Sequence, residues 1–329
     1  KPRSEKIVIN CNISVDDVIA AQDSPSIYEV SKKKKKDKLG ERILKKFNLK
    51  PRRNDLGQWK KMIDRLKNTS RTIDIGIVGK YFVSGDFTMT DSYISVLEAV
   101  KHASSATRCR VNIHWLSAEE IEAKGTGLLK KFDGIIVPQG WGSRGSEGKI
   151  KTIRYCREKG IPYFGLCYGM QMAVVEFARH VAGLKDAHSA EANPKTPYPV
   201  INVMETQKEN LAKGKYGGTI RLGGWPCKTV SGTHLAKVYA KKTGKKGIIS
   251  ERHRHRYEFN PEYRALLEEK GLVIAGTSPD NSIVEAIEIK NHPFFIGTQF
   301  HPEYISRPLD PHPLFVEFVT VCLKLQKRA

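Results

Sequence analysis

The chain has 329 residues, of which 56 are Lys or Arg and 35 are Asp or Glu, giving a formal net charge of +21. A chain of this length predicts two domains, each large enough to bury a core. The six cysteines, at positions 11, 109, 156, 167, 227 and 322, lack the spacing of a disulfide framework or a metal site, which suits a reducing cytoplasm. No signal-peptide pattern and no run of eighteen apolar residues occurs, so we expect a cytoplasmic protein with no membrane partner.

Residues 1–71 hold about half of the net charge, with 20 Lys or Arg against 9 Asp or Glu. The centre of this charge is Lys32–Lys36, followed by Lys38. A nucleic-acid-binding arm is one interpretation. We favour a solvated, flexible linker, because no aromatic residues lie between the lysines to stack on bases. The elements predicted here are a strand over Lys6–Cys11 and helices over Leu39–Leu49 and Leu56–Leu66.

From Thr72 onward, apolar runs alternate with segments of helical spacing. This alternation predicts an α/β fold with a mostly parallel central sheet, helices on both faces and a site at the carboxyl ends of the strands. The later strands predict an antiparallel extension. The expected strands are Ile73–Val78, Val111–Leu116, Gly134–Val137, Ile161–Leu166, Gly218–Leu222, Leu272–Thr277, Ile283–Ile289 and Phe294–Phe300, and the expected helices are Ser92–Ala103, Glu147–Glu158 and Met170–Leu184.

A cysteine, Cys167, stands between the expected strand Ile161–Leu166 and the helix that follows it. Glycines at 165 and 169 flank it and permit a sharp turn. Such a nucleophile elbow lifts a side chain above the sheet and places it at a helix N-terminus, where the helix dipole favours a thiolate. A buried, inert cysteine is the alternative, since free cysteine is often buried.

A histidine and a glutamate, His301 and Glu303, follow the last expected strand directly. A cysteine nucleophile needs a base to take its proton, and that base needs an orienting group. Both strands end at the same edge of a parallel sheet, so we predict that Cys167 is a nucleophile, His301 its base and Glu303 the group that orients the base. Taken alone, His301 would be an ordinary surface histidine.

Two strings carry a family resemblance, Gly-Leu-Cys-Tyr-Gly-Met-Gln at 165–171 and Gln-Phe-His-Pro-Glu at 299–303. Together they resemble the triad-type (class I) glutamine amidotransferases, whose domain is flavodoxin-like. Glu-Arg-His-Arg-His-Arg-Tyr-Glu at 251–258 and Gly-Thr-Ile-Arg-Leu-Gly at 218–223 are similar to CTP synthases in particular. Asp-Ser-Pro-Ser-Ile-Tyr at 23–28 is similar to the end of that family's synthetase domain.

The resemblance implies that residues 1–71 are the tail of a synthetase domain with a basic helical linker, and that 72–329 form a glutaminase domain. It implies hydrolysis of L-glutamine through a cysteine thioester, without a cofactor, to supply ammonia for ATP-dependent amination of UTP to CTP. The complete enzyme would use Mg-ATP, respond to GTP as activator and self-associate through the missing synthetase domain. The chain contains no Gly-x-x-x-x-Gly-Lys-Ser/Thr loop, so we expect it to form no CTP by itself.

The resemblance also implies residue roles beyond the triad. Backbone N–H groups of Gly140 and Tyr168 would form an oxyanion hole. The family usually has Gly-Gly where this chain has Gln139-Gly140, and glutamine tolerates a positive φ poorly. Glutamine would be held by Gln171, Glu191 and Arg256, where the guanidinium suits a carboxylate. GTP would contact Lys80, Arg144, Glu147 and Arg221; the remnant of the UTP and ATP sites would include Lys6, Asp23 and Ser24; no metal ligand is implied.

Two alternatives stay open at this point. The enzymatic one is another triad amidotransferase or a γ-glutamyl hydrolase, against which the His-Arg-His-Arg run argues. The non-enzymatic one is an assembly or nucleic-acid-binding module driven by the basic residues 1–71, whose phosphate contacts would give a steep dependence of binding on salt. We consider nucleic acid an improbable partner.

Overall fold

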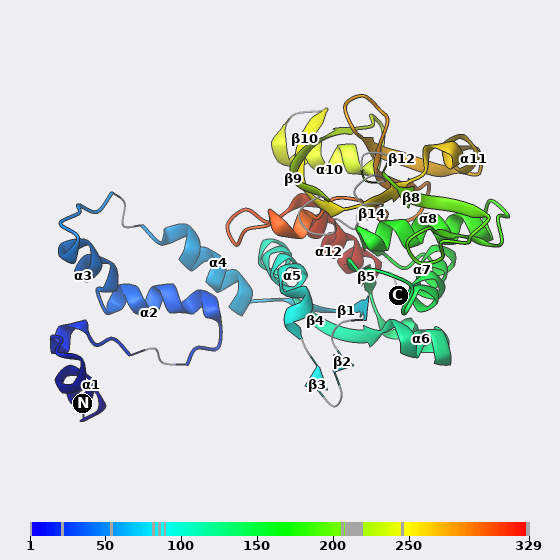
Figure 1. Cartoon of the computed structure of the whole chain (residues 1–329). Helices are drawn as coiled ribbons and strands as arrows, with labels where there is room; N and C mark the ends of the chain where they lie inside the picture. The colour runs from blue at the N-terminus through cyan, green and yellow to red at the C-terminus, as the bar shows by residue number, and fades with distance from the viewer. Residues whose placement is uncertain are drawn as a thin grey trace. The chain divides into compact units, whose positions relative to one another are not determined.

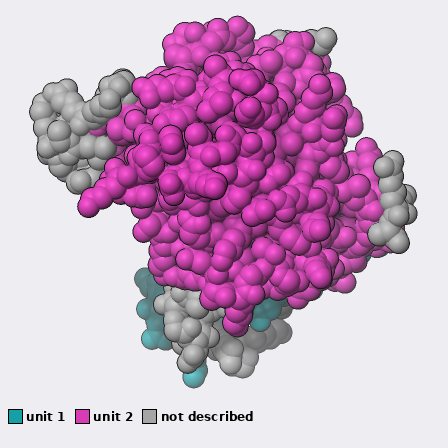
Figure 2. Space-filling model, turned by 90° about the vertical axis from the view of Figure 1, so that its right-hand side faces the viewer, with its two compact units in different colours: residues 1–68 teal, residues 69–329 magenta. Residues whose placement is uncertain are grey.

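The structure is a computed structural model, and it describes residues 2–326 except 21–22, 53–54, 81–82, 85–86, 89, 205–206, 208–219 and 245–246. The chain forms two compact units, residues 1–68 and residues 69–329. Figure 1 shows the elements of each, and Figure 2 colours the two units separately. None of the described helices combines the length and the apolar character that crossing a membrane requires.

Unit 1 is built of short helices around a small core. Tyr28, Met62 and Ile63 are buried, with Trp59 and Leu66 packed against them. The Trp59 indole N–H donates to the Tyr28 carbonyl at 2.7 Å, so its polar atom is satisfied while its ring covers the core. The elements are α1 (Pro2–Cys11), η1 (Val15–Asp17), η2 (Ile27–Glu29), α2 (Val30–Lys36), α3 (Leu39–Lys46) and α4 (Gly57–Lys67).

One prediction for unit 1 is wrong. Residues 6–11 belong to helix α1 and not to a strand. The β-branched run Ile7–Ile9 favoured a strand, but a strand needs a neighbour to satisfy its backbone groups, whereas a helix satisfies them internally. The run Lys32–Lys36, within the predicted basic helical linker, forms most of helix α2. The ammonium groups of Lys33 and Lys34 donate to the backbone carbonyls of Asp23 and Ala20, respectively, in the preceding segment.

Unit 2 is organised by a nine-stranded sheet in the order β10-β9-β12-β13-β14-β6-β5-β1-β4. The strands from β14 to β4 are parallel, and those from β14 to β10 pair antiparallel, which confirms the predicted sheet. Strand β14 joins the two halves. The bounds are β1 (Arg71–Gly79), β4 (Cys109–Ser117), β5 (Gly134–Val137), β6 (Tyr163–Leu166), β9 (Arg221–Thr229), β10 (Ile248–His255), β12 (Leu272–Thr277), β13 (Val284–Ile289) and β14 (Phe295–Thr298).

Helices cover both faces of this sheet (Figure 1). On one face α5, α10 and α12 pack around Phe164, Phe315 and Phe318; on the other α6, α7, α8 and α11 pack around Val137, Tyr163 and Met170. The bounds are α5 (Ile94–Thr107), α6 (Ala118–Lys124), α7 (Ser146–Lys159), α8 (Tyr168–His180), α10 (His234–Thr243), α11 (Arg264–Glu269) and α12 (Pro313–Gln326), with 3-10 turns η3 (Thr90–Tyr93), η4 (Gly127–Lys131), η5 (Pro261–Tyr263) and η6 (Pro302–Tyr304).

Smaller sheets complete unit 2. One contains β11 (Tyr257–Phe259), β8 (Tyr198–Val203) and β7 (Ala187–Ser189), and the other contains β2 (Val83–Ser84) and β3 (Phe87–Thr88). The predicted strand Gly218–Leu222 is described only in part: residues 218–219 lie outside the described residues, and β9 begins at Arg221.

Close backbone approach explains the glycine at 169. A Cβ on Gly169 would lie 2.0 Å from the Val137 carbonyl oxygen, so only glycine lets α8 start directly above the end of β5. A Cβ on Gly165 would lie 2.9 Å from the Gly169 carbonyl carbon, so β6 and the turn depend on both glycines. The sharp turn around Cys167 therefore rests on backbone contact and not on side-chain packing.

We predict that Gly169→Ala destabilises unit 2 by about 3 kcal/mol or more, because the new methyl meets a backbone atom that cannot move aside as a side chain can. Urea unfolding followed by circular dichroism measures this change. Gly127→Ala is the matched control, since a Cβ there meets nothing within 4 Å; it should alter stability by no more than about 1 kcal/mol. Equal stability of the two variants would contradict the prediction.

Candidate active site

Cys167 occupies a strained turn between β6 and α8. Its backbone has φ 51° and ψ −101°, a region that residues with side chains rarely adopt. Its own N–H donates to the Thr298 carbonyl at 2.7 Å, which fastens the turn to the end of β14. The side chain stands at the first turn of a 13-residue helix and is 5% exposed. This is the geometry of a nucleophile elbow.

Strand register brings His301 to the cysteine. β14 pairs in parallel with β6, with Thr298 opposite Leu166, so the residues after both strands emerge at the same edge. His301 is anchored there by its N–H, which donates to the Arg252 carbonyl at 2.7 Å. Its ring stacks on Tyr304, with centroids 4.8 Å apart and planes at 10°. These contacts restrict the imidazole to one orientation.

Glu303 faces the imidazole inside the protein. His301 Nδ1 lies 2.7 Å from Glu303 Oε1, and both side chains are buried. Burial lowers the pKa of His301, but the charges of Glu303 and Cys167 outweigh it and hold the pKa well above the ordinary value. Because Nδ1 is engaged by Glu303, Nε2 is the nitrogen left for the Cys167 thiol. The arrangement can move a proton between sulfur and imidazole.

The loop at 138–142 lies beside this pair, and side chains hold most of its carbonyls. The Pro138 carbonyl accepts from Lys149 at 3.2 Å, and the Gln139 carbonyl from the Tyr93 hydroxyl at 3.4 Å. The Trp141 carbonyl accepts from Lys80, and the Gly142 carbonyl from the Tyr168 hydroxyl at 2.6 Å. Four of the five carbonyls of this loop are therefore engaged, as is usual for buried backbone polar groups.

Gln139 does not strain this loop. It is not among the described residues with a positive φ, so the replacement of a family glycine by glutamine needs no unusual backbone here. A Cβ on Gly140 would lie 3.1 Å from Lys149 Nζ and 3.4 Å from Lys80 Cε, so position 140 is tight on both sides. The expected difficulty at Gln139 is thus wrong, and the tight position is Gly140.

The residues expected to hold glutamine come close to one another. Glu191 accepts the Gly142 N–H at 2.9 Å and lies near the charges of Lys80 and Arg256. Burial raises the pKa of Glu191, and those neighbours oppose the rise. Arg256 is 5% exposed. An anionic and a cationic group side by side suit the two charged ends of an amino acid.

Gln299 is a further site residue, which the sequence analysis missed. Its Nε2 lies 3.5 Å from Cys167 Sγ, and its Oε1 accepts from Gln171 Nε2 at 3.2 Å. Gln171 also donates to the Tyr257 carbonyl at 2.8 Å. Both glutamines are buried, so a chain of amides leads from the sulfur to β11. Its position two residues before His301 was the available signal.

Known proteins resemble this chain in both sequence and fold. The model of the family "Glutamine amidotransferase class-I" matches residues 88–321. The glutaminase domain of Trypanosoma brucei CTPS with bound acivicin superposes with a TM-score of 0.69 at 36% identity, covering 77% of this chain and 94% of that one. The chain belongs to the class I glutamine amidotransferases.

Curated relatives extend this likeness over the N-terminal unit. The CTP synthase of Caldanaerobacter subterraneus subsp. tengcongensis is 50% identical over 323 residues, which is 98% of this chain and 58% of the relative. The CTP synthase of Synechococcus sp. (strain JA-3-3Ab) is 48% identical over 332 residues, 99% of this chain and 58% of the relative. The chain thus spans somewhat more than half the length of these relatives, and within the amidotransferases it is most like CTP synthases.

Of the four residues expected to contact GTP, two are joined directly by a hydrogen bond, and the other two pair with different side chains. Arg144 donates to the Lys80 carbonyl at 2.9 Å, which joins these two. Glu147 instead accepts two hydrogen bonds of 2.9 Å from Arg179. A hydrogen bond with His188 is the main cause that lowers the pKa of Glu147 to about 2. Arg221 is buried against Glu285. Of the remnant set, Lys6, Asp23 and Ser24 all lie in unit 1.

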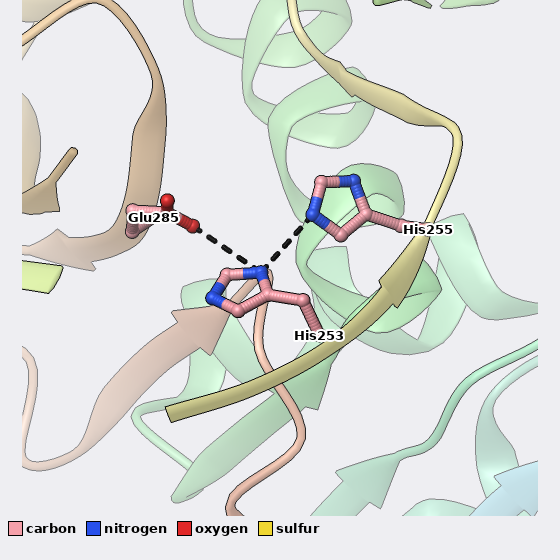
Figure 3. Close-up of side chains that lie close together, drawn as sticks. All are labelled: His253, His255 and Glu285. Atoms are coloured by element: carbon pink, nitrogen blue, oxygen red, sulfur yellow. Dashed lines mark hydrogen bonds and ion pairs between the residues drawn. The ribbon is translucent and has the colours of Figure 1, made fainter. Parts of the chain in front are cut away.

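A buried cluster of possible metal ligands lies on β10 and β13. Donor atoms of His253, His255 and Glu285 lie within 4.8 Å of one another (Figure 3). However, the Arg221 guanidinium lies 2.7 Å from Glu285 Oε1 and already supplies a positive charge there. Burial, more than the nearby charge of Arg221, lowers the pKa of His255 to about 3. This imidazole is therefore neutral. We interpret the cluster as a charge-balanced support under β10, because a cation beside Arg221 would be repelled.

We predict that Glu303→Gln lowers kcat for glutamine hydrolysis about 100-fold or more, within the usual contribution of general acid–base groups. Glu303 raises the pKa of His301, so its neutralisation should lower that pKa and move the basic limb of the pH–rate profile to lower pH. Glutamate release measured from pH 5 to 10 tests both points. Glu262→Gln, an exposed carboxylate, is the control; an unshifted basic limb in Glu303→Gln would contradict the role of Glu303.

Proposed function

We propose that this chain hydrolyses L-glutamine to glutamate and ammonia through a thioester on Cys167. The observation that carries the proposal is the pairing of a strained cysteine at a helix N-terminus with a buried imidazole–carboxylate pair at the end of the adjacent parallel strand. Strain at a residue with a side chain is costly and clusters at functional sites.

The chemistry follows from the positions of these groups. Cys167 Sγ attacks the carboxamide carbon of glutamine while His301 takes the thiol proton and then delivers it to the departing nitrogen as ammonia. The thioester is next attacked by water, whose proton His301 accepts and returns to the sulfur as glutamate leaves. Glu303 stabilises the imidazolium in both steps. The N–H groups of Gly140 and Tyr168 would stabilise the oxyanion, each contributing about 3 kcal/mol.

Glu191 and Arg256, beside the 138–142 loop, suit the two charged groups of the substrate glutamine. Glu191 would accept hydrogen bonds from the α-ammonium of glutamine, and Arg256 would donate to its α-carboxylate. Gln171 would border the pocket for the side chain of the substrate. The buried oxygen Oε1 of Gln171 has no hydrogen-bond partner among the described residues, so a donor from the substrate would satisfy it. Water and glutamine are the only reactants this cycle needs, and it uses no cofactor.

In the complete enzyme, the ammonia would aminate UTP to CTP at the expense of Mg-ATP. This part of the proposal rests on the likeness to CTP synthases over 98–99% of the chain. GTP as activator would contact Lys80 and Arg144, the two members of the expected set that lie together. Lys6, Asp23 and Ser24 would belong to the pyrimidine and ATP sites, and self-association would use the synthetase domain.

We predict that a glutamine-analogue electrophile, 6-diazo-5-oxo-norleucine, labels Cys167 alone among the six cysteines, and that Cys167→Ser abolishes both labelling and glutamate release. Burial raises the pKa of Cys109 to about 11 and also raises the pKa values of Cys156, Cys227 and Cys322, so those thiols stay protonated and unreactive. Peptide mass mapping locates the label. Acivicin, which is bound in the Trypanosoma brucei domain, provides a second probe. A label on Cys109 or Cys156 that survives Cys167→Ser would refute the assignment.

The basic N-terminal unit supports a weaker alternative, nucleic-acid binding. Replacing Lys32–Lys36 and Lys38 with serine should leave kcat for glutamine unchanged within about twofold, because every residue of the proposed catalytic and glutamine-binding set belongs to unit 2. A salt titration of RNA binding by both forms completes the test. Specific RNA binding at physiological salt that disappears in the serine variant would favour the alternative, since phosphate contacts depend steeply on salt.

A further inference from the structure

Lys149 is a fully buried lysine beside the candidate site, and none of the roles above uses it. It lies on α7, is 0% exposed and is among the largest wholly buried side chains of the protein. Among the described residues, no carboxylate forms an ion pair with it. Burying an ammonium without a counter-ion is costly, so this side chain must gain its compensation elsewhere.

The ammonium end of Lys149 contacts the elbow and the 138–142 loop. Nζ donates to the Pro138 carbonyl at 3.2 Å and lies 5.0 Å from the centroid of the Tyr168 ring, within the range of a cation–π interaction. A Cβ on Gly140 would lie only 3.1 Å from this Nζ, so the ammonium is packed against Gly140 itself. Lys149 and Gly140 therefore pack against each other, and the Gly140 N–H is one of the two N–H groups that the proposed reaction uses.

A second lysine contacts the same loop. Lys80 Nζ lies 5.5 Å from the centroid of the same Tyr168 ring and donates to the Trp141 carbonyl. The Tyr168 hydroxyl in turn donates to the Gly142 carbonyl at 2.6 Å. The two lysine side chains and the phenol therefore bind three loop carbonyls, which restricts the backbone of the loop.

We propose that Lys149 is a positioning residue that holds the 138–142 loop, through Pro138 and Gly140, in the conformation needed to stabilise the thioester oxyanion. The inference rests on the proposed glutamine hydrolysis and adds to it the residue that sets the oxyanion hole. Removing one oxyanion donor, or displacing one by about 1 Å, lowers rates about 100-fold. Loss of Lys149 should therefore act on kcat far more than on KM.

The surroundings of Lys149 mostly disfavour its charged form, and Cys167 is the group that favours it. Burial is the main cause that lowers the pKa of Lys149 to about 7; the Lys80 ammonium lowers it further, and the charge of Cys167 opposes both. Lys80 itself has a pKa lowered first by burial and then by Arg144, with Glu191 and Glu119 opposing. The groups facing Lys149 are thus Lys80 at the end of β1, Cys167 at the elbow and the Tyr168 phenol on α8.

The first measurement separates a positioning role from simple packing. Lys149→Met keeps the length and removes the donor, and Lys149→Gln keeps a donor without the charge. We expect kcat to fall about 100-fold in Lys149→Met with KM changed less than about threefold, and Lys149→Gln to recover about tenfold. Lys151→Met, an exposed lysine on the same helix whose Nζ donates to the Glu122 carbonyl at 2.7 Å, should match wild type.

The second measurement asks whether the loop or the thiol is affected. Attack of Cys167 on the amide carbon of glutamine forms an oxyanion. Alkylation of the thiol by 6-diazo-5-oxo-norleucine, which expels N2, or by iodoacetamide, which expels iodide, does not require one. Lys149→Met should therefore slow glutamate release in proportion to kcat and leave alkylation by both reagents within about threefold. An equal fall in glutamate release and in alkylation would overturn the loop role, because the lysine would then act on the thiolate.

Stability against pH shows whether the variants are folded and whether Lys149 is buried as the structure has it. Between pH 7 and the pKa of an ordinary lysine, the unfolded chain binds a proton here that the folded chain does not, so wild-type stability gains with rising pH in that window. Lys149→Met lacks this term. Its urea midpoint relative to wild type should be highest at pH 6 and fall towards pH 9; a pH-independent difference would contradict the burial on which the inference stands.

The outcomes keep the two proposals distinct. A wild-type chain that releases no glutamate and takes no label from the glutamine analogue would overturn the proposed function. An active wild type that Lys149→Met equals in kcat and in both labelling rates would overturn the role of Lys149 alone. A folded Lys149→Met with low kcat, unchanged KM and normal iodoacetamide alkylation supports both.

Discussion

The parallel pairing of β14 with β6 is the contact on which the site depends. It sets Thr298 opposite Leu166, and the Cys167 N–H closes the register by donating to the Thr298 carbonyl. Two segments more than 130 residues apart in sequence thereby end side by side. A slip of one residue would exchange the faces of the strand and turn the residues after it away from the thiol. The geometry of the candidate site is thus a consequence of backbone hydrogen bonds first and of side chains second.

The sequence predicted this arrangement because its signals are local. An apolar strand, glycines at 165 and 169 and a helix leave few conformations for Cys167, and His301 follows a strand directly. The prediction failed where an element depends on distant partners. The apolar run in Lys6–Cys11 fits a strand or a helix equally, and only the presence or absence of a neighbouring strand decides between them. The amide chain through Gln299 likewise depends on packing that no local pattern contains.

Buried and exposed residues alternate along β10, and this alternation could have been predicted from the sequence of the His-Arg-His-Arg run. His253 and His255 are buried, while Arg252 and Arg254, which alternate with them, are exposed, as period-two spacing on a strand requires. The histidines face Glu285 and Arg221 inside the sheet, and the strand's backbone at Arg252 anchors His301. The string 251–258, which carries the family resemblance, is therefore also a structural element, because its strand anchors His301, the proposed base.

Two energetic costs meet in a small volume around the elbow. Cys167 holds a strained backbone, and Lys149 is a fully buried lysine without a carboxylate partner among the described residues. A core selected for stability alone would place glycine at the first position and a methionine-like side chain at the second. Both departures act on the same few atoms, namely the sulfur and the loop beside it. The strain at Cys167 and the burial of Lys149 both destabilise the fold at one place, and the well-packed sheet offsets them. Such local destabilisation is typical of a site that is preorganised for a developing negative charge.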